Sequence, residues 1–258
     1  MPDVAHSRPA PERTGSVPGS PRILCIVTAF NEEGSVADVV RQIHETIPGG
    51  TALVIDDGSR DATARVAREA GARVVRLPFN SGIGTAVQTG FLVARDEGFD
   101  FAVQVDGDGQ HPPDQVLPLV EHALAEGCNY VIGSRFVARD GAYRPSRARK
   151  GGITLFARLV SLVVGQRMTD TTSGLRVADR RTIALFATHY PYDYPEVEAI
   201  VLARRFHLKV AEVPVAMRHR ESGRSSITPL RSVYYMTKVT LAVLIQAVSR
   251  RPRAEELH

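Results

Sequence analysis

Residues 101–108 read Phe-Ala-Val-Gln-Val-Asp-Gly-Asp, an apolar run that ends in two carboxylates. The run predicts a buried parallel strand, and Asp106 and Asp108 follow at its carboxyl end, where open α/β sheets bind ligands. Two carboxylates spaced i, i+2 at a strand end can both bind one hard cation. A Mg²⁺ or Mn²⁺ held in this way usually also binds a substrate phosphate. An acidic, glycine-rich turn is the alternative interpretation.

Two more strand ends upstream carry polar side chains. Residues 52–55 (Ala-Leu-Val-Ile) lead into Asp56 and Asp57, and residues 23–28 lead into Phe-Asn-Glu-Glu at 30–33. Three strand ends of one sheet are therefore expected to present polar or acidic groups to one crevice.

Strands and helices alternate along the first half of the chain, which predicts a doubly wound, mostly parallel sheet. Strands are expected near Ile23–Thr28, Ala52–Ile55, Arg73–Arg76, Phe101–Val105 and Tyr130–Gly133, and helices near Gly34–Thr46, Asp61–Ala70, Gly82–Glu97 and Asp114–Ala125. In the second half we expect helices near 153–164 and 193–206 and strands near 174–178 and 209–215, where Pro214 favours an edge strand.

The composition limits the classes of function. The 258 residues suit one α/β domain, and a net charge of +4 without interleaved aromatic residues argues against nucleic-acid binding. The two cysteines, Cys25 and Cys128, fall in expected strands and are interpreted as buried groups in a reducing compartment. We find no bilayer-length apolar run and no signal peptide, and the proline-rich residues 1–21 are expected to be a disordered tail.

The ordered set of motifs resembles the family 2 glycosyltransferases with a GT-A fold, and in particular their polyprenyl-phosphate, dolichyl-phosphate mannose synthase-like branch. The resemblance covers nearly all of residues 22–226 and implies a Rossmann-like GT-A domain over that range. It rests on residues 27–33 (Val-Thr-Ala-Phe-Asn-Glu-Glu), 56–59 (Asp-Asp-Gly-Ser), 80–86 (Asn-Ser-Gly-Ile-Gly-Thr-Ala), 106–112 (Asp-Gly-Asp-Gly-Gln-His-Pro), 170–176 (Asp-Thr-Thr-Ser-Gly-Leu-Arg) and 220–226 (Arg-Glu-Ser-Gly-Arg-Ser-Ser).

The resemblance implies a nucleotide-sugar site with a bound Mg²⁺ or Mn²⁺. Asp108 would bind the metal directly, Asp106 would bind it or contact the sugar or ribose, and Gln110 is a further ligand, a sugar contact or only a polar turn residue. The nucleoside would contact residues of the first two strand ends, namely Thr28, Phe30, Asn31, Glu32, Asp56 and Asp57, although Asp57 is also a candidate helix cap.

Two glycines and one departure from the family pattern concern the same donor site. Gly82 and Gly84 allow the backbone to approach the ligand closely, or simply form a tight turn. Ile83 stands where relatives often have Lys, which removes a charged contact from this part of the site.

Several basic residues are candidates for binding phosphate. The resemblance implies an arm, with Arg220, Arg224, Ser225 and Ser226, that closes over the pyrophosphate; a solvated basic loop is the alternative. Arg135, together with Arg147 and Lys150, either faces the phosphate of a lipid acceptor or belongs to the solvated surface.

The acceptor decides whether a base is needed. A hydroxyl acceptor needs a carboxylate to take its proton, whereas a phosphate acceptor is already ionised and needs cations. The candidate bases are Asp170, in the segment that lines the acceptor side in relatives, and Glu196 or Glu198, which also suit the first turn of a helix.

Residues 227–258 are expected to form an apolar helix with basic flanks, followed by a tail. This helix either packs on the domain, joins two copies of the chain, or lies on an anionic membrane. We therefore expect a cytoplasmic protein, either free or peripheral on the inner face of the cytoplasmic membrane.

Together these observations predict a metal-dependent, inverting transferase that moves a hexosyl unit from a UDP- or GDP-sugar to an acceptor, most simply a polyprenyl phosphate. Inversion is implied by the resemblance alone. The alternatives are transfer to a soluble or polysaccharide hydroxyl and a non-catalytic nucleotide-binding scaffold. A nucleotidyltransferase is disfavoured because residues 30–33 lack the glycine-rich basic loop of that class.

Overall fold

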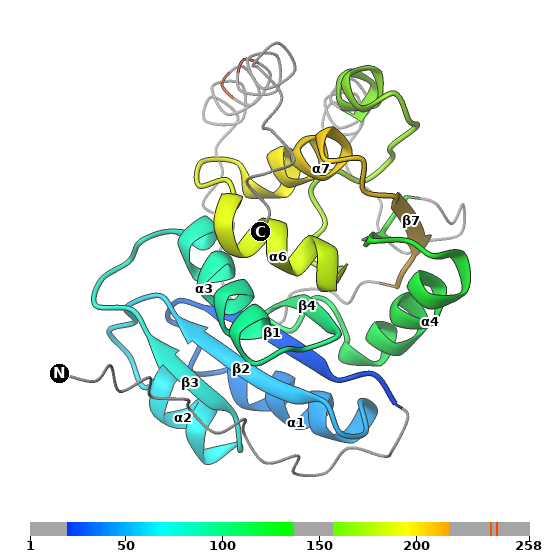
Figure 1. Ribbon diagram of the computed structural model, residues 1–258. Coiled ribbons are helices and arrows are strands. Elements are labelled where there is room, and N and C mark those ends of the chain that lie inside the picture. Colours follow the sequence, from blue (N-terminus) through cyan, green and yellow to red (C-terminus); the bar gives the residue numbers. More distant parts are fainter. Residues whose placement is uncertain (1–19, 137–156, 217–237, 239–240, 242–258) are drawn as a thin grey trace, which may run out of the picture.

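The computed structural model describes residues 20–136, 157–216, 238 and 241 (Figure 1). Its strands are β1 (Ile23–Ala29), β2 (Thr51–Asp56), β3 (Arg73–Arg76), β4 (Phe101–Asp106), β5 (Tyr130–Ser134), β6 (Arg176–Asp179) and β7 (Val210–Pro214). Its helices are α1 (Val36–Thr46), α2 (Thr63–Glu69), α3 (Ile83–Asp96), the 3₁₀ turn η1 (Pro113–Gln115), α4 (Val116–Glu126), α6 (Arg180–His189) and α7 (Pro195–Arg205), and residues 157–164 are also helical.

The strands form one sheet in the order β3-β2-β1-β4-β6-β5-β7. Every pair is parallel except the two made by β6, which runs antiparallel between β4 and β5. The predicted mostly parallel sheet is therefore confirmed. Pro214 lies in β7, which is an edge strand as expected, because proline cannot donate a ladder hydrogen bond.

Alternating side chains of the strands build two hydrophobic cores, one on each face of the sheet. Leu24 and Ile26 of β1 pack with α3, α6, α7 and residues 157–164, whereas Cys25 and Val27 pack with α1, α2 and α4. Figure 1 shows α3 and α1 on opposite sides of the central strands. Because both faces are covered, the central strands are mostly apolar on both sides, which is why they appear in the sequence as apolar runs and not as an alternation of apolar and polar residues.

The main departure from the predicted elements is α6, a helix that was not among the expected ones. It begins at Arg180 because the carboxylate of Asp179 caps it, accepting from the N–H of Thr182 at 2.9 Å. Its buried residues include Ile183, Phe186 and Ala187, spaced i, i+3 and i+4, so the periodic signal was present in the sequence.

Two predictions about chain ends lie outside the described residues. They are the disordered N-terminal tail and the apolar helix near 227–249, apart from positions 238 and 241. In the part of the chain that is described, no helix has both the length and the apolarity required to cross a bilayer.

Candidate active site

The three predicted strand ends lie side by side. In the registers of the parallel pairs, Thr28 lies opposite Asp106 of β4, and Ala29 lies opposite Asp56 of β2. The carboxyl ends of β2, β1 and β4 therefore meet at one edge of the sheet, as the sequence indicated.

A pocket of about 290 Å³ opens at this edge. Its lining residues come from the end of β1 and the loop after it, from the loops after β2 and before α3, from the start of α3, and from the end of β4 with the turn that follows. It is lined by Thr28, Ala29, Phe30, Glu32, Asp57, Asn80, Gly82, Ile83, Ala86, Asp106, Gly107 and Asp108. Thr28, Phe30, Glu32, Asp57 and Gly82, all predicted to contact the donor, are thus brought together with both carboxylates of the acidic motif.

Asp106 is held from the rear of the pocket. Its Oδ2 lies 3.2 Å from Nδ1 of the buried His111, and its side chain keeps 28% of its surface exposed. Burial alone would raise the pKa of Asp106, but the hydrogen bond and charge of His111, and the charges of Arg176 and Arg135, lower it overall. Asp106 is therefore an ionised acceptor group.

Asp108 is fixed by the turn that follows it. Its Oδ1 accepts from the backbone N–H of Gln110 at 3.0 Å, and its Oδ2 accepts from the Gln110 side-chain amide at 2.9 Å. Gln110 thus orients Asp108 through its amide nitrogen, and its amide oxygen is the atom that would be offered to a ligand.

Two neighbouring acids after β2 have different surroundings. Asp56 is fully buried, accepts from the N–H of Ser59 at 2.9 Å and lies 3.2 Å from Nε of Arg76, so it stabilises the turn beneath the pocket. Asp57 faces the pocket and accepts from the N–H groups of Ser81 and Gly82 at 2.7 and 2.9 Å. Asp57 therefore binds the loop that leads into α3, and α3 has no side-chain cap, so neither α3 nor the helix after Asp57 is capped by this carboxylate in the manner of the alternative interpretation.

The loop after β1 is shaped by its own hydrogen bonds. Asn31 has a left-handed backbone (φ 55°), its N–H donates to the Ser59 hydroxyl, and its side-chain oxygen accepts from the N–H of Arg60. Asn31 thus joins two loops and is not among the pocket-lining residues, whereas Phe30 is 42% exposed and lies in the pocket.

Gly84 packs closely against the loop between α6 and α7 and is not among the pocket-lining residues. A Cβ atom there would lie 2.7 Å from the carbonyl oxygen of Pro191 and 2.8 Å from Cα of Tyr192. At Gly82, by contrast, a Cβ atom would meet nothing within 4 Å, and the residue takes a φ of +88°, which favours glycine at the start of α3.

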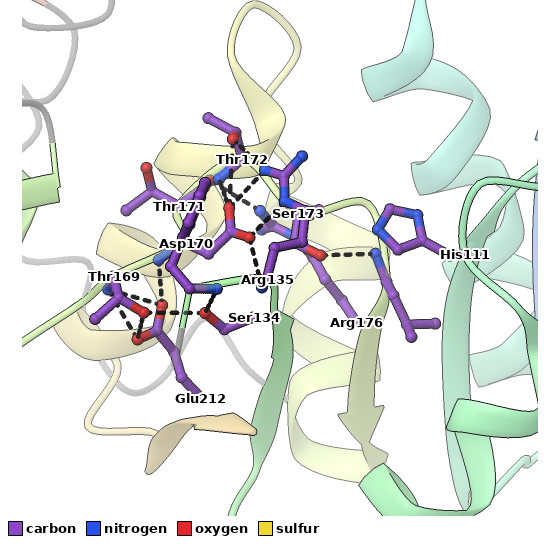
Figure 2. Close-up of polar contacts among 12 residues, drawn as sticks. His111, Ser134, Arg135, Thr169, Asp170, Thr171, Thr172, Ser173, Arg176 and Glu212 are labelled. Carbon is purple, nitrogen blue, oxygen red and sulfur yellow. Dashed lines mark hydrogen bonds and ion pairs between the residues drawn. The ribbon is translucent and has the colours of Figure 1, made fainter. Parts of the chain in front are cut away.

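The loop that joins residues 157–164 to β6 is held in place by the hydrogen bonds and ion pair of two carboxylates, Glu212 and Asp170 (Figure 2). Glu212 of β7 accepts from the N–H groups of Thr169 and Asp170 at 2.8–2.9 Å and 2.7 Å. Asp170 is buried and forms a forked ion pair with Arg135, at 2.6 Å from Nε and 2.7 Å from Nη2. Burial would raise the pKa of Asp170, but Arg135 lowers it overall, which makes Asp170 a poor proton acceptor.

Of the candidate bases, Glu196 has the surroundings that best suit a proton acceptor. Burial raises its pKa, the charge of Arg176 opposes that rise, and the charge of Asp106 adds to it, so the net shift is upward. The pKa of Glu198 is also raised, by burial and by the charge of Asp193. Both glutamates lie in the first turn of α7, which is the alternative role that the sequence indicated for them.

Three residues near the acidic motif were given no role from the sequence alone. They are His111, Gly174 and Arg176, each of which stood out only as a member of a motif. Arg176 is buried and donates to the carbonyl oxygens of Ser173, Thr171 and Glu196. A charged residue within an otherwise apolar strand was the signal that could have identified it.

The predicted phosphate-binding arm, with Arg220, Arg224, Ser225 and Ser226, lies outside the described residues, as do Arg147 and Lys150. Of the predicted phosphate-binding residues only Arg135 is described, and its side chain is turned toward Asp170 and the hydroxyl of Thr172.

Comparison with known proteins gives a consistent result. The sequence model of glycosyl transferase family 2 matches residues 24–184. The chain is 29% identical over 215 residues to an undecaprenyl-phosphate mannosyltransferase of Micrococcus luteus, covering 80% of this chain and 88% of the relative. It is 27% identical over 218 residues to a UDP-N-acetylglucosamine–dolichyl-phosphate N-acetylglucosaminyltransferase of Methanococcus voltae, covering 77% and 86%.

Among solved structures, the fold is similar to that of glucosyl-3-phosphoglycerate synthase from Mycobacterium tuberculosis in complex with Mn²⁺, UDP-glucose and phosphoglyceric acid. The TM-score is 0.63 at 24% identity, and the match covers 91% of this chain and 81% of that one. At this identity the likeness concerns the fold.

Proposed function

The chain belongs to glycosyl transferase family 2, and from this premise we propose that it is a metal-dependent, inverting enzyme that transfers a hexosyl unit from a nucleotide-sugar to a polyprenyl phosphate. The observation that carries the proposal is the 290 Å³ pocket, in which Asp106 and Asp108 lie beside Asp57 and Phe30. Such a pocket suits a ligand with a planar base at one end and a diphosphate at the other.

The residues present fit a hard divalent cation. Asp106 and Asp108 offer carboxylate oxygens at one strand end, and no group of three or more acidic, histidine or cysteine ligands occurs among the described residues. Two protein carboxylates suit Mg²⁺ or Mn²⁺, which complete their shells with water and substrate phosphate oxygens. When bound, such an ion supplies positive charge that stabilises a departing diphosphate.

The chain's own residues would do the rest by binding and orientation. Phe30 offers an apolar surface for the base, and Asp57 is a hydrogen-bond acceptor that the N–H groups of Ser81 and Gly82, just before α3, already hold in place. Gln110 fixes the orientation of Asp108, and His111 contacts Asp106. Both carboxylates are thus oriented before the donor arrives, which reduces the reorganisation needed for transfer.

A phosphate acceptor is supported by the two named relatives, which differ in the sugar but share a polyprenyl- or dolichyl-phosphate in their names. It is also consistent with the state of Asp170, whose two oxygens are both engaged by Arg135. An ionised phosphate needs no base, and its lipid chain would bring the reaction to a membrane surface.

The second candidate is transfer to a hydroxyl, and one observation favours it. Glu196 has a raised pKa and feels the charge of Asp106, so it has the character of a general base near the site. The two candidate reactions predict different effects on transfer when the Glu196 carboxylate is removed.

The test is an assay of the purified full chain with Mn²⁺ or Mg²⁺ and a panel of radiolabelled UDP- and GDP-sugars, with and without a short polyprenyl phosphate. Label that enters the organic phase from one donor, and is lost with EDTA and in Asp108→Asn, would support the proposal. Asp114→Asn, at an exposed acid of the same segment, is the matched control and should retain activity.

Glu196→Gln separates the two acceptors. Transfer to a lipid phosphate should survive this change, whereas transfer to a hydroxyl should fall by about a hundredfold or more. Label that appears only in water-soluble products, and disappears in Glu196→Gln, would replace the polyprenyl-phosphate proposal with the hydroxyl one.

A further inference from the structure

The carboxylate of Asp106 has little freedom because two residues bound it, one five positions further along the chain and one in the loop before β6. His111 approaches Oδ2 with Nδ1 at 3.2 Å. The backbone of Gly174 also lies so close that a Cβ atom there would be 2.1 Å from Oδ2 and 2.6 Å from Cγ of Asp106. Asp106 also lines the pocket and keeps part of its side-chain surface exposed, so its carboxylate can offer lone pairs there.

His111 reaches this position because the chain turns back after Asp108. Gly109 takes a φ of +74°, a conformation that favours glycine, and the turn brings His111 beneath the end of β4. The imidazole is then buried, with 2% of its side-chain surface exposed.

The burial of this imidazole argues against a role in packing alone. Its Nε2 atom has no hydrogen-bond partner in the described part of the chain, and its hydrogen bond to Asp106 is made through Nδ1. Burying an unpartnered ring nitrogen costs free energy that an apolar side chain would avoid. A carboxylate only accepts hydrogen bonds, so Nδ1 of His111 is the atom placed to donate to Oδ2 of Asp106.

We propose that His111 and Gly174 are positioning residues that together fix the carboxylate of Asp106 for a divalent cation and the diphosphate of the donor. His111 supplies the hydrogen bond and Gly174 supplies the space. This inference rests on the proposed function, since it concerns the same pocket. Groups that orient metal-binding carboxylates typically change metal affinity by about 10- to 100-fold when removed.

The first experiment measures Mn²⁺ affinity of the full chain from the electron paramagnetic resonance signal of free Mn²⁺. Asparagine carries its amide nitrogen where histidine has Nδ1, and glutamine carries its own where histidine has Nε2. His111→Asn should therefore bind Mn²⁺ within about threefold of the wild type, whereas His111→Gln and His111→Ala should bind about tenfold more weakly or worse. His122→Ala, on α4 and away from the pocket, is the control.

Gly174→Ala tests the space that the glycine leaves for the Asp106 carboxylate. The atom it would meet is the end of a short side chain, so the fold can adjust by moving the carboxylate. We expect a circular dichroism spectrum like that of the wild type, with Mn²⁺ affinity about tenfold lower or worse. Gly34→Ala, where a Cβ meets nothing within 4 Å, should change neither. Equal affinities for all His111 and Gly174 variants would overturn the inference.

The second experiment needs no metal and separates this inference from the proposed function. In metal-free protein labelled with ¹⁵N-histidine, His111 should show the Nδ1-protonated form, assigned by its loss in His111→Asn. Its Nδ1 proton should shift in Asp106→Asn. An unchanged signal there would overturn the inference whatever the metal result. Should the wild type bind no Mn²⁺ while this signal responds, the positioning contact stands and the metal-dependent function fails.

Discussion

Arg135 and Asp170 form a forked ion pair, in which Nε and Nη2 of the guanidinium donate to the two carboxylate oxygens at 2.6 and 2.7 Å. The backbone N–H of Arg135 adds a third bond, at 3.0 Å. Asp170 is buried, and the pair joins the end of β5 to the loop before β6. It therefore fixes the end of β5 against the loop before β6.

Asp170→Asn should destabilise the fold by about 3 kcal/mol at neutral pH, because it leaves the Arg135 guanidinium mostly buried without its carboxylate. Urea unfolding followed by circular dichroism measures the change. Glu69→Gln, which breaks the exposed pair of Arg65 and Glu69, is the matched control and should cost less than about 0.5 kcal/mol. Equal losses of unfolding free energy in the two variants would show that the buried pair of Asp170 contributes no more to stability than an exposed pair.

The contribution of Asp170 should depend on pH. Burial raises its pKa and Arg135 lowers it by more, so the folded-state pKa lies below the unfolded value. Its stabilisation is then present above the unfolded pKa, about 4, and is lost as pH falls through the folded pKa. The difference in unfolding free energy between wild type and Asp170→Asn should be constant from about pH 7 to 5 and shrink below about pH 4.

Arg176 should stabilise the fold mainly through the shape of its guanidinium group, which reaches several acceptors at once. It donates to the Ser173 carbonyl at 2.7 Å, to the Glu196 carbonyl at 2.5 Å and to the Tyr130 hydroxyl at 3.0 Å. Arg176→Lys keeps the charge but cannot reach these acceptors together, so we expect a loss of about 2 kcal/mol, and about 3 kcal/mol or more in Arg176→Met. Denaturant unfolding of both variants checks this; a lysine variant as stable as the wild type would show that charge alone suffices.

The central strands could be predicted from sequence because their signal is local. Residues 23–29, 51–56 and 101–106 are mostly apolar runs with acidic or other polar residues at or just after their ends, and parallel strands bring such ends together without further information. That is why Thr28, Phe30, Glu32, Asp57, Asp106 and Asp108 were identified as one site.

The supports of the site could not be predicted in the same way. The closeness of Gly174 to Asp106 depends on β6 running antiparallel beside β4, and the pairing of Arg135 with Asp170 depends on β5 lying next to β6. Neither register leaves a periodic trace in the chain. The close packing of Gly84 was not predicted for a similar reason, since its neighbours, Pro191 and Tyr192, come from a loop more than a hundred residues away.

Any side chain at position 90 should destabilise the fold, because Gly90 packs closely on β1. A Cβ atom there would lie 2.3 Å from Cγ2 of Ile26, which is fully buried in β1. Overpacking costs about 2–3 kcal/mol, and the better helix propensity of alanine returns about 1 kcal/mol. Gly90→Ala should therefore lose about 1–2 kcal/mol in thermal or denaturant unfolding. Gly34→Ala should stay within about 0.5 kcal/mol of the wild type, and a Gly90→Ala variant of equal stability would contradict the close packing of α3 on β1.

Ile83 offers a way to add charge to the donor pocket. It is the first residue of α3, lines the pocket and is 38% exposed, so a lysine there can extend its ammonium group toward a bound diphosphate. Ile83→Lys should strengthen binding of the nucleoside diphosphate of the active donor by about three- to tenfold at low salt, and the gain should vanish near about 0.5 M NaCl. A positive charge at a helix N-terminus should at the same time cost about 0.5 kcal/mol of stability.

Isothermal titration calorimetry at two salt concentrations measures the gain in nucleotide affinity, with Ile83→Met as the uncharged control of similar reach. If Ile83→Met and Ile83→Lys bind the nucleotide equally well at both salt concentrations, the diphosphate does not lie beside the start of α3.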